Sequence, residues 1–306
     1  MWDITLPNLR LNLDNYFISK LSDLMRSETM KLNFIILILI FSFSSVKAEE
    51  FTMASIGDSV SRAYNAKSFF SNDKLNWSSG SGPRKNKGEE EFSSHYIKIQ
   101  KMFPEKKVNA INVAIAGSTT RSLKKQIRRL LRKDKKIDYA TILTGVNNLC
   151  RIRRNHDEKI NKMKVEMKNA VQTLINHNPK VKIVMVPIPN MESLFEAMRD
   201  KRKCRRIWNF VPLCKQYLRK KVSEEKRDAF LARVEQANKG LEEVAKEFED
   251  NVFFNLHLSF IEFGEESISN LDCFHPNTQG QSLISEYTWN PEFILGRELR
   301  PDEDFY

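Results

Sequence analysis

Residues 51–61 read FTMASIGDSVS, an apolar run that ends in Gly-Asp-Ser. The run, residues 51–56, has the length and character of a strand buried in a parallel sheet. The Ser59 hydroxyl is therefore expected at the carboxyl edge of that sheet, where open α/β sheets place their chemistry. A Gly-Asp-Ser tripeptide alone is more often a turn or a helix cap, so Ser59 needs support from other segments.

A second segment, far along the chain, places a carboxylate three residues before an imidazole. It reads DCFHPN and contains Asp272 and His275. One short loop or helical turn at this spacing can hold the carboxylate against the histidine ring. Together with Ser59, the pair would supply a nucleophile, a base and an acid that orients the base.

Two further strand ends carry hydrogen-bond donors. Residues 112–118, NVAIAGS, read as a strand that ends at Gly117, and residues 140–148, ATILTGVNN, read as a strand that ends in Gly-x-Asn at Asn147. A backbone N–H and a side-chain amide at the same sheet edge are the groups from which an oxyanion hole can be assembled.

In the order Ser, Gly, Asn and Asp-x-x-His, these blocks resemble those of the SGNH, or GDSL, family of serine esterases and lipases. The resemblance runs from about residue 51 to about residue 289. It implies an α/β fold of three layers, flavodoxin-like, with a five-stranded parallel sheet. It also implies chemistry that needs no metal or organic cofactor.

The resemblance assigns a role to each matched residue. Ser59 would be the nucleophile, His275 the general base and acid, and Asp272 the residue that orients the histidine. The oxyanion hole would consist of the Ser59 and Gly117 backbone N–H groups and the Asn147 side chain.

The third block departs from the family pattern in one residue. It usually reads Gly-x-Asn-Asp, whereas residue 148 here is Asn148. The hydrogen-bond donor at the preceding position, Asn147, is kept. The departure therefore puts in doubt only the structural hydrogen bonds that an aspartate at position 148 would make. Within the family, Gly-x-Asn-x-Leu-Cys and a later Cys-Lys-Gln-Tyr-Leu are similar to the secreted lipase and phospholipase-B-like branch.

The sequence contains four cysteines and no paired short spacings typical of metal ligands. In an exported protein an even set favours one or two disulfides, with three possible connectivities, and free buried thiols are the alternative. Similarity to the secreted lipase branch favours a bond between Cys150 and Cys214, which leaves Cys204 and Cys273.

The N-terminal region reads as a targeting segment. Residues 34–41 are continuously apolar, follow Met30-Lys31 and precede small residues that end at Ala48. The run is too short to span a bilayer, so residues 30–48 are expected to be a secretory signal peptide. Residues 1–29 would then be an extension created by an early start site, with a long n-region or a retained anchor as alternatives. The mature chain, residues 49–306, is expected to be one SGNH/GDSL hydrolase domain in a secreted or periplasmic protein.

Apolar runs and helical spacings alternate along the mature chain. Strands are expected at residues 51–56, 108–115, 139–144, 181–187 and 252–258, with helices between them. Two stretches interrupt the alternation. Residues 66–90 read as a flexible loop and residues 190–222 as a basic insert, and both are placed to form walls of the active site.

The formal net charge is +11, and the cations are clustered. Residues 121–136 contain nine Lys or Arg beside one Asp, around an apolar helical stripe of Leu123, Ile127, Leu130 and Leu131, and residues 199–206 contain six more. The clusters are either solvated helix faces or sites of attraction to anionic membranes or acidic polysaccharide. Nucleic acid is disfavoured because no motif for it appears. No feature indicates an obligate protein partner.

The four other histidines, His95, His156, His177 and His257, lack ligand spacing, which favours surface or satisfied core roles over metal binding. The sequence thus predicts an exported serine esterase or lipase, with a phospholipase among the candidates. The alternatives are a carbohydrate O-acetyl esterase and a non-catalytic basic surface-binding protein with a relic site.

Overall fold

The computed structural model describes residues 48–82, 92–133, 136–300, 303 and 305. The expected N-terminal extension and, apart from Ala48, the expected signal peptide lie outside the described residues, as do residues 83–90 of the expected loop. In the part of the chain that is described, no helix is long and apolar enough to cross a membrane.

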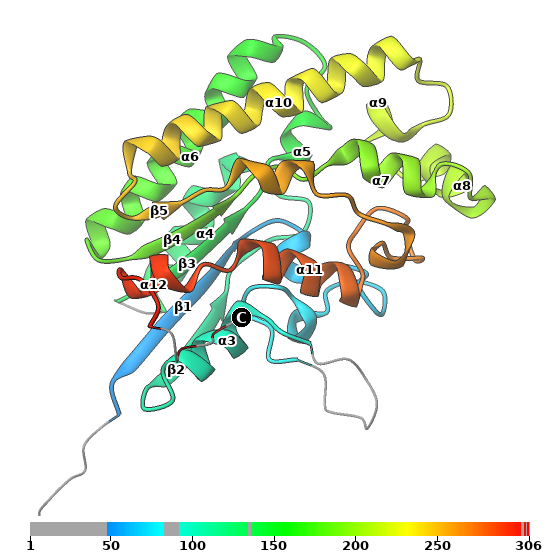
Figure 1. The fold of residues 1–306 in the computed structure, drawn as a ribbon. Helices are drawn as coiled ribbons and strands as arrows, with labels where there is room; N and C mark the ends of the chain where they lie inside the picture. Colours follow the sequence, from blue (N-terminus) through cyan, green and yellow to red (C-terminus); the bar gives the residue numbers. More distant parts are fainter. Residues whose placement is uncertain (1–47, 83–91, 134–135, 301–302, 304, 306) are drawn as a thin grey trace, which may run out of the picture. The chain divides into compact units, whose positions relative to one another are not determined.

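The centre of the fold is a five-stranded sheet in the order β2-β1-β3-β4-β5, in which every neighbouring pair is parallel (Figure 1). This confirms the expected flavodoxin-like arrangement. The strands are β1 (Glu50–Gly57), β2 (Lys107–Asn112), β3 (Tyr139–Leu143), β4 (Lys182–Val186) and β5 (Val252–Phe253). All five residues of β3 are buried, because helices cover both faces of the sheet.

The helices divide between the two faces according to the direction of each crossover. The connection from β1 to β2 runs one way across the sheet and the later connections run the other way, so right-handed crossovers put their helices on opposite faces. One face carries α3 and α11, and the other carries α4, α6 and α10. Their bounds are α3 (His95–Met102), α4 (Leu123–Leu131), α6 (His156–His177), α10 (Glu224–Glu247) and α11 (Thr278–Thr288). Two short helices, α5 (Val146–Leu149) and α12 (Pro291–Leu295), follow β3 and α11.

The switch in crossover direction decides where a site can form. The chain leaves β1 toward β2 and later returns to place β3 on the other side of β1. Loops from neighbouring strands therefore diverge above the carboxyl end of β1 and leave a crevice there. Ser59 follows this strand directly.

Two expected strands were too long. The strand expected at 108–115 ends at Asn112, whose side chain bends the backbone by accepting from Ala114 N. The strand expected at 252–258 is only two residues long. Asn255 then caps a 3-10 helix, Leu256–Phe260, by accepting from His257 N.

The described part of the loop expected at residues 66–90 is anchored to the core over its second half. Trp77 is fully buried, and its backbone N–H donates to the Gln281 side chain on α11 at 3.0 Å. The Ser78 hydroxyl is hydrogen-bonded to Thr141 on β3. The abundance of Ser, Gly and Asn suggested mobility, but a tryptophan in such a segment can anchor it to the core.

The basic insert, residues 190–222, folds as three helices: α7 (Met191–Met198), α8 (Arg202–Phe210) and α9 (Lys215–Leu218). Two disulfides attach it to the catalytic edge. Cys150–Cys214 joins it to the end of α5, and Cys204–Cys273 joins α8 to the segment between Asp272 and His275. This is the connectivity that the branch resemblance favoured.

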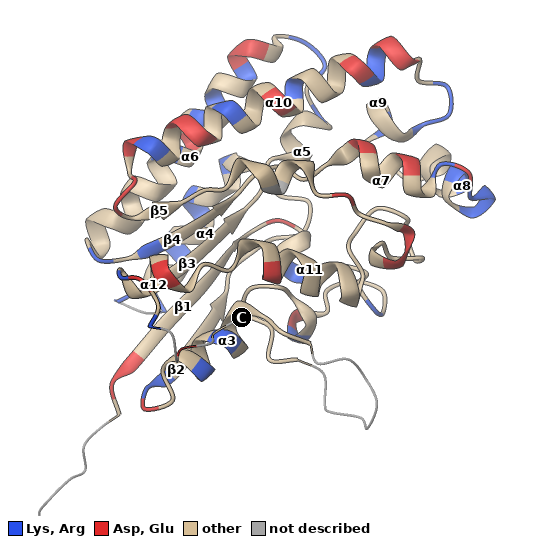
Figure 2. Ribbon diagram, viewed as in Figure 1, with Lys and Arg blue, Asp and Glu red and all other residues tan. Residues whose placement is uncertain are grey.

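Helix α4 separates apolar from cationic residues as the sequence predicts. Leu123, Ile127 and Leu130 are buried, and Leu131 is half-buried. The lysines and arginines between them are exposed, and the helix contains no acidic residue, as Figure 2 shows by its blue and tan segments.

Candidate active site

The turn after β1 is shaped by its glycine. Gly57 has a φ of +149°, and a Cβ there would lie 2.1 Å from the Leu143 carbonyl oxygen, so no larger residue fits. The buried side chain of Gln126, on α4, accepts from Gly57 N and donates to Gly57 O, both at 2.9 Å. Ser59 then begins a short 3-10 helix, Val60–Arg62, with its side chain almost fully buried.

The structure brings together the three residues that sequence reasoning placed in a triad. His275 Nε2 lies 2.8 Å from Ser59 Oγ, and His275 Nδ1 lies 2.6 Å from Asp272 Oδ2. The other carboxylate oxygen, Oδ1, accepts from the backbone N–H groups of Phe274 and His275, each at 3.0 Å. These bonds close a tight turn, which is why a three-residue spacing suffices to hold acid and imidazole together.

Sequence reasoning missed Asn65. Its side-chain amide nitrogen donates to Asp272 Oδ2 at 2.5 Å, and its backbone carbonyl oxygen accepts from the Ser269 hydroxyl. Its own Oδ1 accepts from Phe70 N, which fixes the amide orientation. Asn65 has a φ of +57°, a conformation that asparagine tolerates, but 207 positions separate it from Asp272 and no local signal links the two.

Burial of Asp272 by itself favours its neutral form. The hydrogen bond and charge of His275, with the Asn65 amide, outweigh burial and hold the pKa of the carboxyl below its ordinary value. Asp272 is therefore ionised whenever the histidine can act as a base.

The expected oxyanion donors lie around the same edge. Asn147 is the second residue of α5, and its amide nitrogen donates to Asp58 Oδ2 at 3.4 Å, a long contact. The second N–H of this amide makes no hydrogen bond to any described residue and can donate to a substrate. Gly117, with a φ of +72°, lies in the loop after β2, and the next residue, Ser118, donates its hydroxyl to Gly57 O. This bond ties the loop to the turn that carries Ser59.

A sequence profile of the GDSL-like lipase/acylhydrolase family matches residues 55–283, more than half of the chain. The protein belongs to this family. No curated protein sequence gave a significant match.

Distant likenesses were found among solved structures, and the three described here have TM-scores below 0.5. The crystal structure of TesA has 15% identity, covers 78% of this chain and 96% of its own, with a TM-score of 0.47. A putative GDSL-like lipase from Parabacteroides merdae has 14% identity, and the match covers 81% of this chain and 96% of that one, with a TM-score of 0.48. A variant of an acetyl xylan esterase from Geobacillus stearothermophilus has 16% identity, and the match covers 83% of this chain and 100% of that one, with a TM-score of 0.46.

Asn148, which replaces the usual family carboxylate, is hydrogen-bonded to Thr120 through both atoms of its amide. Its Oδ1 accepts from Thr120 N at 3.0 Å, and its Nδ2 donates to Thr120 Oγ1 at 2.8 Å. The Thr120 hydroxyl donates its hydrogen bond to Glu166. An aspartate at 148 would compete with Glu166 for that donor. The Asn148 amide instead accepts from the Thr120 N–H and donates to the Thr120 hydroxyl oxygen. The amide thus ties the loop after β2 to α5.

Asp58, the acidic residue of the GDSL block, is buried beside the site. Burial raises its pKa to about 6, against the lowering influence of the Val60 N–H bond, the charge of His275 and the Asn147 amide. Sequence reasoning treated this residue only as part of a motif, because its burial depends on the tertiary structure.

The raised pKa predicts a pH-dependent stability. The folded protein holds the Asp58 proton more tightly than the unfolded chain, so ionising it costs stability as the pH rises from about 4 through about 6. The Asp58→Asn variant lacks this cost. We expect the free energy of unfolding of the parent, relative to the variant, to fall by about 3 kcal/mol over this range. Urea unfolding of both proteins at pH 4 to 8 measures it; a constant difference would contradict the prediction.

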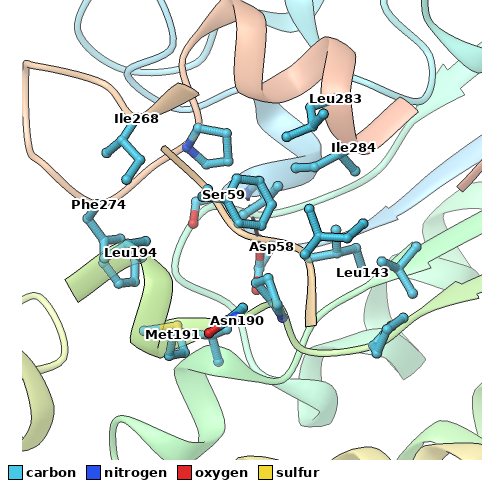
Figure 3. A pocket seen from close by; sticks show the side chains of 18 of the residues that line it. Asp58, Ser59, Leu143, Asn190, Met191, Leu194, Ile268, Phe274, Leu283 and Ile284 are labelled. Atoms are coloured by element: carbon cyan, nitrogen blue, oxygen red, sulfur yellow. Dashed lines mark hydrogen bonds between the residues drawn. The ribbon is translucent and has the colours of Figure 1, made fainter. Parts of the chain in front are cut away.

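An apolar pocket opens beside Ser59 in this GDSL-family protein (Figure 3). Leu194, Phe274 and Ile268 lie on one side of Ser59, and Leu143 and Ile284 on the other. The insert contributes to one wall. The apolar side chains are those of Val60, Leu143, Val146, Val186, Met191, Leu194, Ile261, Phe263, Ile268, Phe274, Leu283 and Ile284, with prolines at 187, 189 and 276.

The remaining histidines lie elsewhere. His95 is fully buried between Tyr139 OH and Thr288 Oγ1, and burial lowers its pKa to about 3, so it is a neutral core residue. His177 and His257 are exposed and His156 is half-buried. Within the described ranges, no three His, Cys, Asp or Glu side chains form a group that could hold a metal ion.

Proposed function

We propose that this protein hydrolyses carboxylic esters with acyl chains longer than acetyl, through Ser59, His275 and Asp272. The observation that carries the proposal is the continuous hydrogen-bonded line from Asp272 through His275 to Ser59 Oγ, at the mouth of an apolar pocket. A protein that binds without catalysis would not need these three side chains to be aligned by hydrogen bonds.

In the first step, His275 Nε2 takes the proton of Ser59 Oγ as the oxygen attacks the ester carbonyl. Asp272 holds Nδ1 protonated, which keeps Nε2 free as the base and stabilises the imidazolium. The charge on the carbonyl oxygen is stabilised by the Ser59 and Gly117 N–H groups and the Asn147 amide. His275 then protonates the leaving alcohol, and a water activated by the same histidine releases the acid.

The pocket favours an acyl chain over an acetyl group. Its walls are almost entirely aliphatic or aromatic, so each buried methylene of a substrate contributes about 0.8 kcal/mol. An acetylated carbohydrate presents one methyl group and many hydroxyls, so it would gain little from contact with these apolar walls. The pocket thus supports the lipase or esterase alternative over the O-acetyl esterase.

A chain-length series tests the proposal. We expect kcat/KM for 4-nitrophenyl octanoate to exceed that for the acetate by about 10- to 100-fold, because additional methylenes enter the pocket. Leu283, on α11, lines the pocket and is half-buried. The larger side chain of the Leu283→Trp variant should therefore narrow the pocket. It should lower turnover of the octanoate and spare the acetate, which serves as its control. Equal rates on both esters in the parent would favour the acetyl esterase instead.

We further propose that the mature protein is exported and begins at Glu49. Two disulfides support this compartment, since such bonds persist in oxidising surroundings. The segment that would direct export, residues 30–48, lies almost wholly outside the described residues. N-terminal sequencing of protein recovered from the periplasm or medium should start at Glu49. A start upstream of the apolar run would point to a retained anchor.

A further inference from the structure

Asn147 and Asn148 line two different hollows at the start of α5. Asn147 lines the apolar pocket, and Asn148 lines an open cleft formed with the loop before α4 and with α6. The Cα atoms of neighbouring residues are about 3.8 Å apart, so one short stretch of α5 borders both hollows.

The cleft is strongly cationic. Arg121, Arg151, Lys159 and Lys162 line it, and Glu166 is its one carboxylate. Within the described residues, no carboxylate makes a salt bridge with any of the four cations, and Glu166 accepts from the Thr120 hydroxyl. The four cations outnumber the one carboxylate, so they repel one another, and a bound anion relieves that repulsion.

The geometry of α6 directs its lysines into the cleft. Lys159, Lys162 and Glu166 are spaced three and four residues apart and share one helix face. Of the nearby acids, Asp157 accepts from Gln236, and Glu158, four residues before Lys162, accepts from Asn155.

Arg151 connects the cleft to the reaction centre. One guanidinium nitrogen donates to Gly117 O at 2.8 Å. Gly117 is the residue whose N–H is proposed to bind the oxyanion, so this bond ties one cation of the cleft to the loop that borders the reaction centre. The cations come from three segments of the chain and line one cleft, which a solvated face of a single helix would not do.

We propose that this cleft binds an anionic group, phosphate or carboxylate, on the alcohol part of the ester. The substrate is then an amphiphile with an acyl chain in the apolar pocket and a negatively charged head in the cleft. This inference rests on the proposed ester hydrolysis and specifies its substrate class.

The test compares three octanoyl esters with the same acyl chain: those of glycerol, of glycerol 3-phosphate and of glyceric acid. The parent should prefer one or both anionic esters. In Lys159→Gln/Lys162→Gln, KM for the preferred anionic ester should rise about tenfold with kcat nearly unchanged, because the lost contacts bind ground and transition states alike. Turnover of the glycerol ester should not change. Preference for the phosphate or for the carboxylate identifies the anionic group.

The matched control is Lys101→Gln/Lys180→Gln, which removes two exposed lysines at the amino end of the sheet. It should leave every KM unchanged. If both double variants lose the same affinity, or if the parent does not distinguish anionic from neutral esters, the cleft inference is overturned and ester hydrolysis stands. If the parent cleaves none of the three esters and no 4-nitrophenyl octanoate, the proposed function fails, and the inference with it.

Discussion

Replacing Ser59 with alanine is expected to lower kcat for 4-nitrophenyl octanoate by about 10⁴- to 10⁶-fold. The hydroxyl that lies 2.8 Å from His275 Nε2 is the atom that would form the acyl-enzyme, and without it only water can attack. Burst and steady-state kinetics measure the loss. A fluorophosphonate probe should label the parent at Ser59, as seen by mass spectrometry, and leave the variant unlabelled.

Ser61 provides the matched control. It lies two residues away, is buried, and its hydroxyl makes no hydrogen bond to any described residue. Ser61→Ala should therefore keep both its fold and its kcat. Labelling that persists in Ser59→Ala would show that another residue is the nucleophile.

Asp272→Asn is expected to lower kcat by about 10³- to 10⁴-fold while the protein stays folded. The carboxylate accepts from both His275 Nδ1 and the Asn65 amide. An asparagine amide that faces the ring donates to Nδ1, which leaves the proton on Nε2, and the histidine then cannot take the Ser59 proton. The pH dependence of kcat and circular dichroism separate this loss from unfolding.

Asp138→Asn is the control for the same chemical change at a distance. Asp138 precedes β3 at the opposite end of the sheet and accepts from Thr52 N. This variant should retain kcat within about twofold, since the change lies at the opposite end of the sheet from the triad and shares no hydrogen-bond partner with it. A retained kcat in Asp272→Asn would instead mean that the histidine is oriented by other groups.

The sequence by itself determined the fold class and the residues of the four blocks. Buried parallel strands are apolar along their whole length, so β1, β3 and β4 were found within a residue or two. The sequence could not give the ends of β2 and β5, because Asn112 and Asn255 terminate them through side-chain bonds to nearby backbone. Composition also gave no sign that residues 75–78 are anchored in the core, because the polar residues there are buried together with Trp77.

What only the tertiary structure decided is the surroundings of those blocks. Asn65 reaches Asp272 across 207 positions, and the two hollows at Asn147 and Asn148 are assembled from segments far apart in the chain. Local sequence carries the preference of a residue for a strand end or a turn, because neighbours along the chain set it. The burial that shifts the pKa of Asp58 and the gathering of cations in one cleft arise only when distant segments pack together. Desolvation and the interaction between charges depend on distance in space and not on position in the chain.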